Sequence, residues 1–169
     1  VIPFYKDSAD RLENLECILN FIVDNFDTNI ILVESTNSTY HFPPLKSYDK
    51  LNHSVEYIFH KQEGEIFHRT RVINTGIKEA KTPYIAIYDV DVVFDPLQIA
   101  MAYTQLQEGA DMVYPFESDF VDIERSYIKD GVINERASYA KDSLGGAVFL
   151  NKDVYWLAGY ENEKLFTKR

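Results

Sequence analysis

The sequence predicts an α/β fold, a three-layer sandwich in which helices cover both faces of a mainly parallel central sheet. Strand-like and helix-like segments alternate along the 169 residues, a pattern typical of parallel sheets. One segment, "YIAIY" at 84–88, is a short run of apolar and aromatic β-formers. The composition, 46% hydrophobic and 26% charged, fits a single domain that buries roughly 70% of its unfolded surface.

The first half of the chain supplies three strands and one helix. "VIPFY" at 1–5 is a short strand, and the "KDSAD" that follows offers several helix-capping side chains. "NIILVES" at 29–35 and "VEYIFHK" at 55–61 are further strands, separated by a polar loop over 36–50. Between the first two strands, apolar residues recur at spacings of three and four, which predicts a helix: Leu12, Leu15, Ile18, Leu19, Ile22, Val23 and Phe26.

The middle of the chain continues the alternation. "HRTRVINTGIKEAK" at 68–81 has an apolar helical face. "TPYIAIYDVDVVF" at 82–94 is the clearest strand in the sequence. "DPLQIAMAYTQLQEG" at 95–109 predicts a helix, because proline stands in its first turn and glycine at its end.

The last third is less regular. "ADMVYPF" at 110–116 is a strand, and the acidic span 117–141 is expected to be irregular. "GGAVFLNKDVYWLAGY" at 145–160 then predicts a strand that leads into a short helix.

Charge and cysteine content narrow the function classes. The net charge of −10 argues against a nucleic-acid partner and against an anionic membrane surface, but a nucleotide could still bind locally. The single cysteine, Cys17, excludes an intramolecular disulfide and fits a reducing compartment. No apolar run approaches the ~20 residues that cross a bilayer. We therefore expect a cytoplasmic chain without a transmembrane segment, associated with membranes only through missing segments or partners.

Two aspartates stand near the carboxyl end of the clearest predicted strand. Asp89 and Asp91 are two residues apart, so in an extended segment they would face the same side and repel each other. Mg²⁺ or Mn²⁺ would relieve that repulsion, since these ions bind one or two carboxylates together with phosphates. Asp7 and Glu34 also lie at or beyond strand ends, where ligands bind in open α/β sheets. The alternative is a frayed strand end whose carboxylates are solvated.

Arg69 stands near the predicted start of the helix at 68–81. A cation there has the wrong sign for the helix dipole, so contact with an anion would explain it better. The free N–H groups of a helix start also favour phosphate. The alternative is an ordinary surface arginine.

Together these stretches resemble the glycosyltransferases of the GT-A fold, and most of all the β-1,4-galactosyltransferase and chondroitin-synthase-like group. The resemblance implies a nucleotide-diphospho-sugar transferase architecture. It covers nearly the whole chain in the family's order, with least support over 36–54 and 117–137. The matching stretches are "VIPFYKD", "IFHRTRVINTGIKEA", "YDVDVVFDP" and "GGAVFLNKDVYWLAGYENEKLF".

The resemblance implies a nucleoside pocket near the first two strands. Pro3, Phe4 and Tyr5 would line this pocket, and Asp7 just beyond them would contact the nucleotide. Glu34 matches the acidic residue that commonly reads the base in this superfamily, although galactosyltransferases have no acidic residue there.

It also implies the residues around the diphosphate. Phe67 and Arg69 match the family's Phe-x-Arg, with the arginine near the diphosphate. Asp91 matches the Mn²⁺ or Mg²⁺ ligand of the D-x-D motif, with Asp89 beside it at the metal. Asp89 and Val90 would contact the ribose and the donor sugar.

Gly145 and Gly146 match a Gly-Gly pair at which the backbone approaches the substrates closely. The implied reaction transfers a hexose or N-acetylhexosamine from a UDP-sugar to a hydroxyl of a saccharide or glycoconjugate acceptor, with inversion. The metal and the arginine would stabilise the leaving diphosphate, and a carboxylate would take the acceptor's proton. Such enzymes build cell-surface polysaccharides and glycoconjugates.

The sequence departs from this family at its end. After "GY" the family continues to a Trp-Gly-Trp-Gly-like stretch and a Glu-Asp pair that holds the base, whereas this sequence reads "ENEKLFTKR". We therefore expect one nucleotide-sugar-binding domain over 1–169, truncated before a catalytic base that lies beyond residue 169. A substitute base in the acidic span 117–124 is a weaker interpretation than a solvated loop. The alternative function is a non-catalytic sugar-nucleotide- or partner-binding module. A sugar-phosphate nucleotidyltransferase is disfavoured because no glycine-rich signature follows the first strand.

Overall fold

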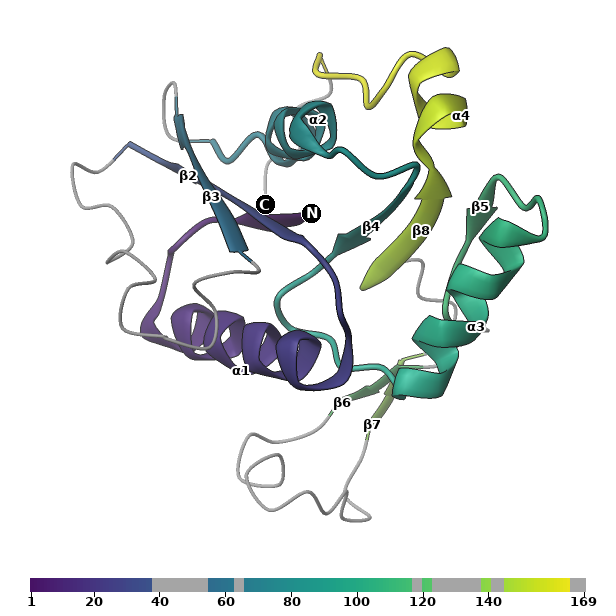
Figure 1. The fold of residues 1–169 in the computed structure, drawn as a ribbon. Coiled ribbons are helices and arrows are strands. Elements are labelled where there is room, and N and C mark those ends of the chain that lie inside the picture. Colours follow the sequence, from purple (N-terminus) through teal and green to yellow (C-terminus); the bar gives the residue numbers. More distant parts are fainter. Residues whose placement is uncertain (38–54, 63–65, 117–119, 123–137, 141–144, 165–169) are drawn as a thin grey trace. The chain divides into compact units, whose positions relative to one another are not determined.

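The computed structural model describes residues 1–37, 55–62, 66–116, 120–122, 138–140 and 145–164 (Figure 1). The chain forms two compact units. The first comprises Val1–Pro115 and Gly146–Arg169, and the second comprises Phe116–Gly145. Apart from Gly145, the candidate site residues all belong to the first unit.

The first unit begins with three parallel strands in the order β1-β2-β3. These are β1 (Ile2–Phe4), β2 (Ile30–Thr36) and β3 (Val55–Lys61). Strand β2 is buried along its whole length, as expected for the central strand of a parallel sheet with helices on both faces. Figure 1 shows helices α1 (Ala9–Asn25) and α2 (Arg69–Glu79) on opposite sides of these strands.

Helix α1 forms where the apolar spacing predicts it. Ser8 is its N-cap, and the Ser8 hydroxyl accepts a hydrogen bond of 3.1 Å from the Arg11 backbone N–H. The helix buries four of the predicted apolar residues: Leu15, Ile18, Leu19 and Ile22.

Three more strands follow in the order β4-β8-β5, with β8 antiparallel to both neighbours. They are β4 (Tyr84–Tyr88), β8 (Ala147–Asn151) and β5 (Met112–Val113). Helix α3 (Pro96–Gln107) connects β4 to β5 and begins with a capping box, and the short helix α4 (Lys152–Leu157) follows β8.

Two backbone hydrogen bonds join these strands to the first three. The Val1 nitrogen donates to the Ala86 carbonyl at 2.7 Å, and the Tyr88 N–H donates to the Val1 carbonyl at 3.0 Å. This pattern is that of parallel neighbours, so β4 lies beside β1. The carboxyl ends of β1, β2 and β4 therefore meet at one edge of the sheet.

Helix α2 packs closely on this sheet. A Cβ atom placed on Gly76 would lie 2.5 Å from Cγ1 of Val1 and 3.0 Å from Cγ2 of Val33, so only glycine leaves room here. The core beneath the helix joins α2, β2, β4 and β8 through these buried residues: Ile31, Val33, Val72, Ile73, Ile77, Ala80, Ile85, Ile87 and Leu150.

The second unit contains an antiparallel strand pair, β6 (Phe120–Asp122) and β7 (Ser138–Ala140), with Phe120 opposite Ala140. The expectation of an irregular span over 117–141 is therefore wrong at these six positions, because they pair with each other. The other residues of that span, and most of the predicted loop at 36–50, lie outside the described residues.

The α/β class and the mainly parallel sheet are confirmed. Within the residues that the structure describes, no helix has the length and apolar character that a membrane span requires. One strand ends earlier than predicted: β4 stops at Tyr88, and residues 90–91 form a turn. The premise that Asp89 and Asp91 project together from an extended strand is therefore wrong.

Candidate functional site

The candidate site lies at the sheet edge where β1 and β4 end and α2 begins. Tyr5 follows β1, Asp89 follows β4, and Phe67 and Arg69 bracket the start of α2. Gly146 immediately precedes β8 and pairs with Asp89. Five predicted site residues therefore come from four separate elements to this edge.

An ion pair occupies the centre of this edge. Nη2 of Arg69 donates to Oδ1 of Asp89 at 2.6 Å. The two side chains keep 40% and 29% of their surface exposed, so solvent or a ligand can still contact both. This contact shows that Arg69 does meet an anion at the helix start, and that the anion here belongs to the chain itself.

The backbone of Gly146 holds Asp89 from the other side. The Asp89 N–H donates to the Gly146 carbonyl at 2.7 Å, and the Gly146 N–H donates to Oδ2 of Asp89 at 3.4 Å. Gly146 has a φ of 96°, in the left-handed region that glycine adopts without strain. This conformation explains why glycine is needed at 146. Gly145 lies in the other unit and is exposed.

Asp91 is the exposed carboxylate of the pair and lies in the turn after β4. Among the described residues, no cluster of three or more acidic, histidine or cysteine side chains could form a complete metal cage. A single open carboxylate fits Mg²⁺ or Mn²⁺ bound mainly by substrate phosphates and water. Asp89 is less available, because Arg69 and Gly146 engage both of its oxygens.

Two aromatic rings stack beside the ion pair. The Tyr5 and Phe67 ring centroids are 5.4 Å apart, and their planes differ by 18°. Both residues are half-buried, so the stack also reaches the surface. The structure thus brings together two residues that were predicted separately as nucleotide contacts.

Three other predicted contacts lie in the interior. Pro3 and Phe4 are buried in β1, and Phe4 has no exposed surface. Val90 is only 4% exposed. In this structure these side chains pack in the core.

Glu34 is also interior, inside β2 and not at its end. It is 1% exposed, and its Oε2 accepts a hydrogen bond of 2.6 Å from the Tyr57 hydroxyl on β3. Asp7 lies outside the cluster and forms an exposed ion pair of 3.4 Å with Arg11 on α1. The structure therefore does not bring these two carboxylates to Arg69 and Asp89.

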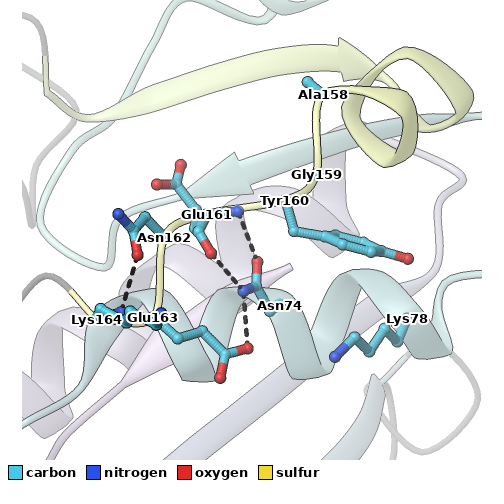
Figure 2. A pocket seen from close by; sticks show the side chains of 9 residues that line it. All are labelled: Asn74, Lys78, Ala158, Gly159, Tyr160, Glu161, Asn162, Glu163 and Lys164. Atoms are coloured by element: carbon cyan, nitrogen blue, oxygen red, sulfur yellow. Dashed lines mark hydrogen bonds between the residues drawn. The ribbon is translucent and has the colours of Figure 1, made fainter.

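A second feature of the structure was not predicted from the sequence. Residues 158–164, here called the strap, lie along α2 (Figure 2). Asn74 of α2 binds the strap through both ends of its side-chain amide, at Glu161 and Glu163. A sequence signal existed, because Asn74 interrupts the apolar face formed by Val72, Ile73 and Ile77.

The strap and α2 line an open, shallow pocket of about 430 Å³. Tyr155 of α4 also contacts Asn74, since its hydroxyl donates to Oδ1 at 3.4 Å. Burial raises the pKa of the Tyr155 phenol, and the negative charge of Glu161 raises it further. Tyr155 therefore remains a neutral donor. The pocket is lined by Asn74, Lys78 and the whole strap: Ala158, Gly159, Tyr160, Glu161, Asn162, Glu163 and Lys164.

Comparison with known proteins identifies the family of the chain and solved structures with a similar fold. The model of the family described as "Glycosyl transferase family 2" matches residues 1–141. No curated protein matches the chain. Several solved structures do, at identities that indicate the fold alone.

Two of these structures are TarS 1-349 of S. aureus and HddC from Yersinia pseudotuberculosis, each 14% identical to this chain. For TarS 1-349 the TM-score is 0.57, with 98% of this chain and 50% of that chain covered. For HddC the TM-score is 0.54, and the match covers 97% of this chain and 80% of HddC. A structure of TarS 1-349 in complex with UDP-GlcNAc is also similar, with a TM-score of 0.53 and 13% identity. That match covers 95% of this chain and 47% of the other. The chain thus spans about half of TarS 1-349, and the predicted GT-A type of fold is confirmed.

Proposed function

Because the chain belongs to glycosyl transferase family 2, we propose that it is the donor-binding domain of a metal-dependent, inverting glycosyltransferase. The donor is a UDP-hexose or UDP-N-acetylhexosamine, and the acceptor is a hydroxyl of a saccharide or glycoconjugate. The four stretches that resemble the β-1,4-galactosyltransferase and chondroitin-synthase-like group support a role in cell-surface polysaccharide or glycoconjugate synthesis. The single cysteine favours a cytoplasmic location.

The observation that carries this proposal is the Arg69–Asp89 pair at the carboxyl edge of the sheet, beside the Tyr5–Phe67 stack. Ligands of open α/β folds bind at this edge. Arg69 opens α2, so a diphosphate there meets both a guanidinium and the free N–H groups of the helix start. The aromatic stack offers an apolar surface for the nucleoside. The similarity to a structure that holds UDP-GlcNAc supports UDP as the nucleotide.

Asp91 would hold the divalent cation, since its carboxylate is exposed at the same edge. When bound, the cation would neutralise charge on the leaving diphosphate. Arg69 would stabilise the same charge from the helix start, and Asp89 would orient Arg69 through their ion pair.

Calorimetric titration with UDP, with and without Mn²⁺, tests this assignment. We expect Mn²⁺ to strengthen UDP binding and Asp91→Ala to abolish that gain. Asp111→Ala is the matched control, because Asp111 is an exposed aspartate that precedes β5. If Mn²⁺ has no effect on UDP binding by the unmodified chain, the proposal is wrong.

Arg69→Ala tests the placement of the diphosphate. A hydrogen bond to a charged partner contributes about 1.5–3 kcal/mol, so the variant should bind UDP roughly ten- to a hundredfold more weakly. Uridine, which lacks phosphate, should lose little. Arg71→Ala removes a cation two residues further along α2 and is the control. Equal losses for UDP and uridine would place Arg69 elsewhere than at the diphosphate.

Turnover separates the enzyme from a non-catalytic binding module. The full-length protein should release UDP from at least one of UDP-N-acetylglucosamine, UDP-galactose and UDP-glucose when Mn²⁺ and an acceptor saccharide are present. Metal-dependent UDP binding without any turnover would favour the binding module.

A further inference from the structure

We propose that the pocket between the strap and α2 binds one sugar unit of the acceptor, and that this acceptor is a neutral saccharide rich in hydroxyl groups. The inference rests on the proposed function and adds a site for the acceptor near the donor cluster. The residues that carry it belong to α2, α4 and the strap.

Asn74 holds the two walls of the pocket together and is only 2% exposed. Its Nδ2 donates to the Glu161 carbonyl at 3.0 Å and to Oε1 of Glu163 at 2.9 Å. Its Oδ1 accepts from the Glu161 N–H at 3.1 Å. Nε of Arg71 lies 3.8 Å from the Glu163 carboxylate. These contacts fix the shape of the pocket before any ligand binds, which lowers the entropic cost of binding.

One end of the pocket carries an aromatic surface. Figure 2 shows the Tyr160 ring at this end, near Lys78, whose Nζ is 5.4 Å from the ring centroid. The Trp156 ring packs edge-on against Tyr160, with the centroids 5.2 Å apart, and Trp156 keeps 60% of its surface exposed. A partly exposed aromatic pair offers an apolar surface to the C–H groups of a sugar ring, while polar groups around it bond the hydroxyls.

The polar lining of the pocket suits hydroxyl groups. Two cationic side chains, Lys78 and Lys164, and two anionic ones, Glu161 and Glu163, line it, so their charges balance. Ammonium groups donate hydrogen bonds, carboxylates accept them, and the exposed Asn162 amide does both. A sugar hydroxyl also donates and accepts, so it can pair with each of these groups. A balanced lining gives no advantage to a phosphate or another anion.

The size and openness of the pocket fit one unit of a longer saccharide. Its volume of about 430 Å³ lies within the range of about 300–1,000 Å³ that ligand pockets span. Because the pocket is open, the sugar units on either side of the bound one can remain in solvent. The pocket therefore does not limit the length of the acceptor.

The pocket also lies near the donor cluster. The Tyr155 hydroxyl donates to Oδ1 of Asn74 at 3.4 Å. Burial and the charge of Glu161 raise the pKa of this phenol, whereas the positive charge of Arg69 lowers it, so Arg69 is within electrostatic range of the same hydroxyl. Along α2, Lys78 is about 14 Å from Arg69, because a helix rises about 1.5 Å per residue. An acceptor bound in the pocket can therefore extend along α2 to the donor.

Titration with disaccharides, followed by tryptophan fluorescence, tests the site. Trp156 is the only tryptophan of the sequence and packs against Tyr160, so its emission reports on the pocket. The probes are cellobiose, lactose and N,N′-diacetylchitobiose, with digalacturonate as the anionic control. We expect a saturable change in fluorescence with at least one neutral disaccharide and a weaker response to digalacturonate.

Variants at the two ends of the pocket locate the binding. Lys78→Met removes the ammonium at one end, and Asn162→Ala removes the amide at the other. Each should weaken disaccharide binding, Lys78→Met by about tenfold, because it loses a hydrogen bond from a charged donor. Lys81→Met is the matched control, since Lys81 is an exposed lysine just after α2 that does not line the pocket.

The affinity for UDP with Mn²⁺, measured by calorimetry, should be the same in all three variants. In turnover assays, Lys78→Met and Asn162→Ala should raise the KM for the acceptor and leave the KM for the UDP-sugar unchanged. A parallel rise in both KM values would overturn the assignment of the pocket to the acceptor.

The inference is also overturned if none of the three neutral disaccharides changes the fluorescence, or if both pocket variants bind them as tightly as Lys81→Met does. Tighter binding of digalacturonate would overturn the assignment to a neutral saccharide. Disaccharide binding by a protein that fails to bind UDP with Mn²⁺ would instead refute the proposed function, so the two failures are distinguishable.

Discussion

Replacing Gly76 by alanine tests whether the close approach of α2 to the sheet is needed. In an exposed helix interior this change stabilises a protein by about 1 kcal/mol, because alanine has the higher helix propensity. At Gly76 the added Cβ would stand 2.5 Å from the Val1 side chain and 3.0 Å from the Val33 side chain. Val33 is fully buried in the central strand and cannot move aside, so α2 must shift instead.

The size of the effect depends on these two opposing contributions. Overpacking of a dense core costs about 1–3 kcal/mol, which outweighs the gain of about 1 kcal/mol from propensity. We expect a net loss of up to about 2 kcal/mol. For a chain of this length each kcal/mol lowers the Tm by about 2–4 °C. The direction of the change is what tests the argument, because Gly76→Ala at an uncrowded site would raise the Tm.

Thermal unfolding followed by circular dichroism measures the change, with Gln105→Ala on the exposed face of α3 as the control. Val1→Ala removes the nearer of the two contacts, so the double variant should lose less stability than the sum of the two single changes. Because the shift moves the start of α2, Gly76→Ala should also weaken UDP binding. A higher Tm for Gly76→Ala, or strict additivity with Val1→Ala, would refute the reasoning.

Three further changes concern the elements that support the site, and urea unfolding measures each. Tyr57→Phe removes the hydrogen bond of 2.6 Å that the tyrosine hydroxyl donates to the buried Glu34 carboxylate, so we expect the free energy of unfolding to fall by about 1.5–3 kcal/mol. Tyr103→Phe, at an exposed tyrosine, is the control and should change little. Equal effects of the two changes would contradict the argument. Ser8→Ala removes the N-cap of α1 and should cost about 0.5–2 kcal/mol, whereas Ser8→Asn should restore most of it. Asp95→Ala removes the capping box of α3 and should cost a similar amount; no loss would show that Pro96 alone starts this helix.

Where one local pattern decides an element, the sequence predicted it well. The predicted third strand coincides with β3 at Val55–Lys61, and the apolar spacing placed α1 correctly. The end of β4 was predicted wrongly for a physical reason. The apolar pattern continues through Val90, but Asp89 is held by Arg69, 20 residues away, and by Gly146, 57 residues away. Contacts between residues so far apart in the sequence cannot be predicted from the local periodicity of apolar residues.

In the candidate site, too, the sequence predicted some residues correctly, while the placement of others depends on contacts between distant parts of the chain. Motif resemblance selected Arg69, Asp89 and Gly146, which the structure brings into contact. It could not show that Phe4 and Glu34 are interior, because burial depends on the helices that cover both sides of the sheet. Nor could it assign Asn74, whose partners lie 87 and 89 residues further along the chain. The antiparallel direction of β8 was likewise hidden, because the chain passes through the second unit before it returns.

The ion pair between Arg69 and Asp89 has a consequence for how a nucleotide would enter and leave. One guanidinium N–H already donates to Asp89 at 2.6 Å before any ligand arrives, so the arginine is held in place while its other N–H groups can bind a diphosphate. Asp89 would stay beside the bound diphosphate and oppose part of its attraction to Arg69. A site arranged in this way would favour exchange of the nucleotide over tight retention.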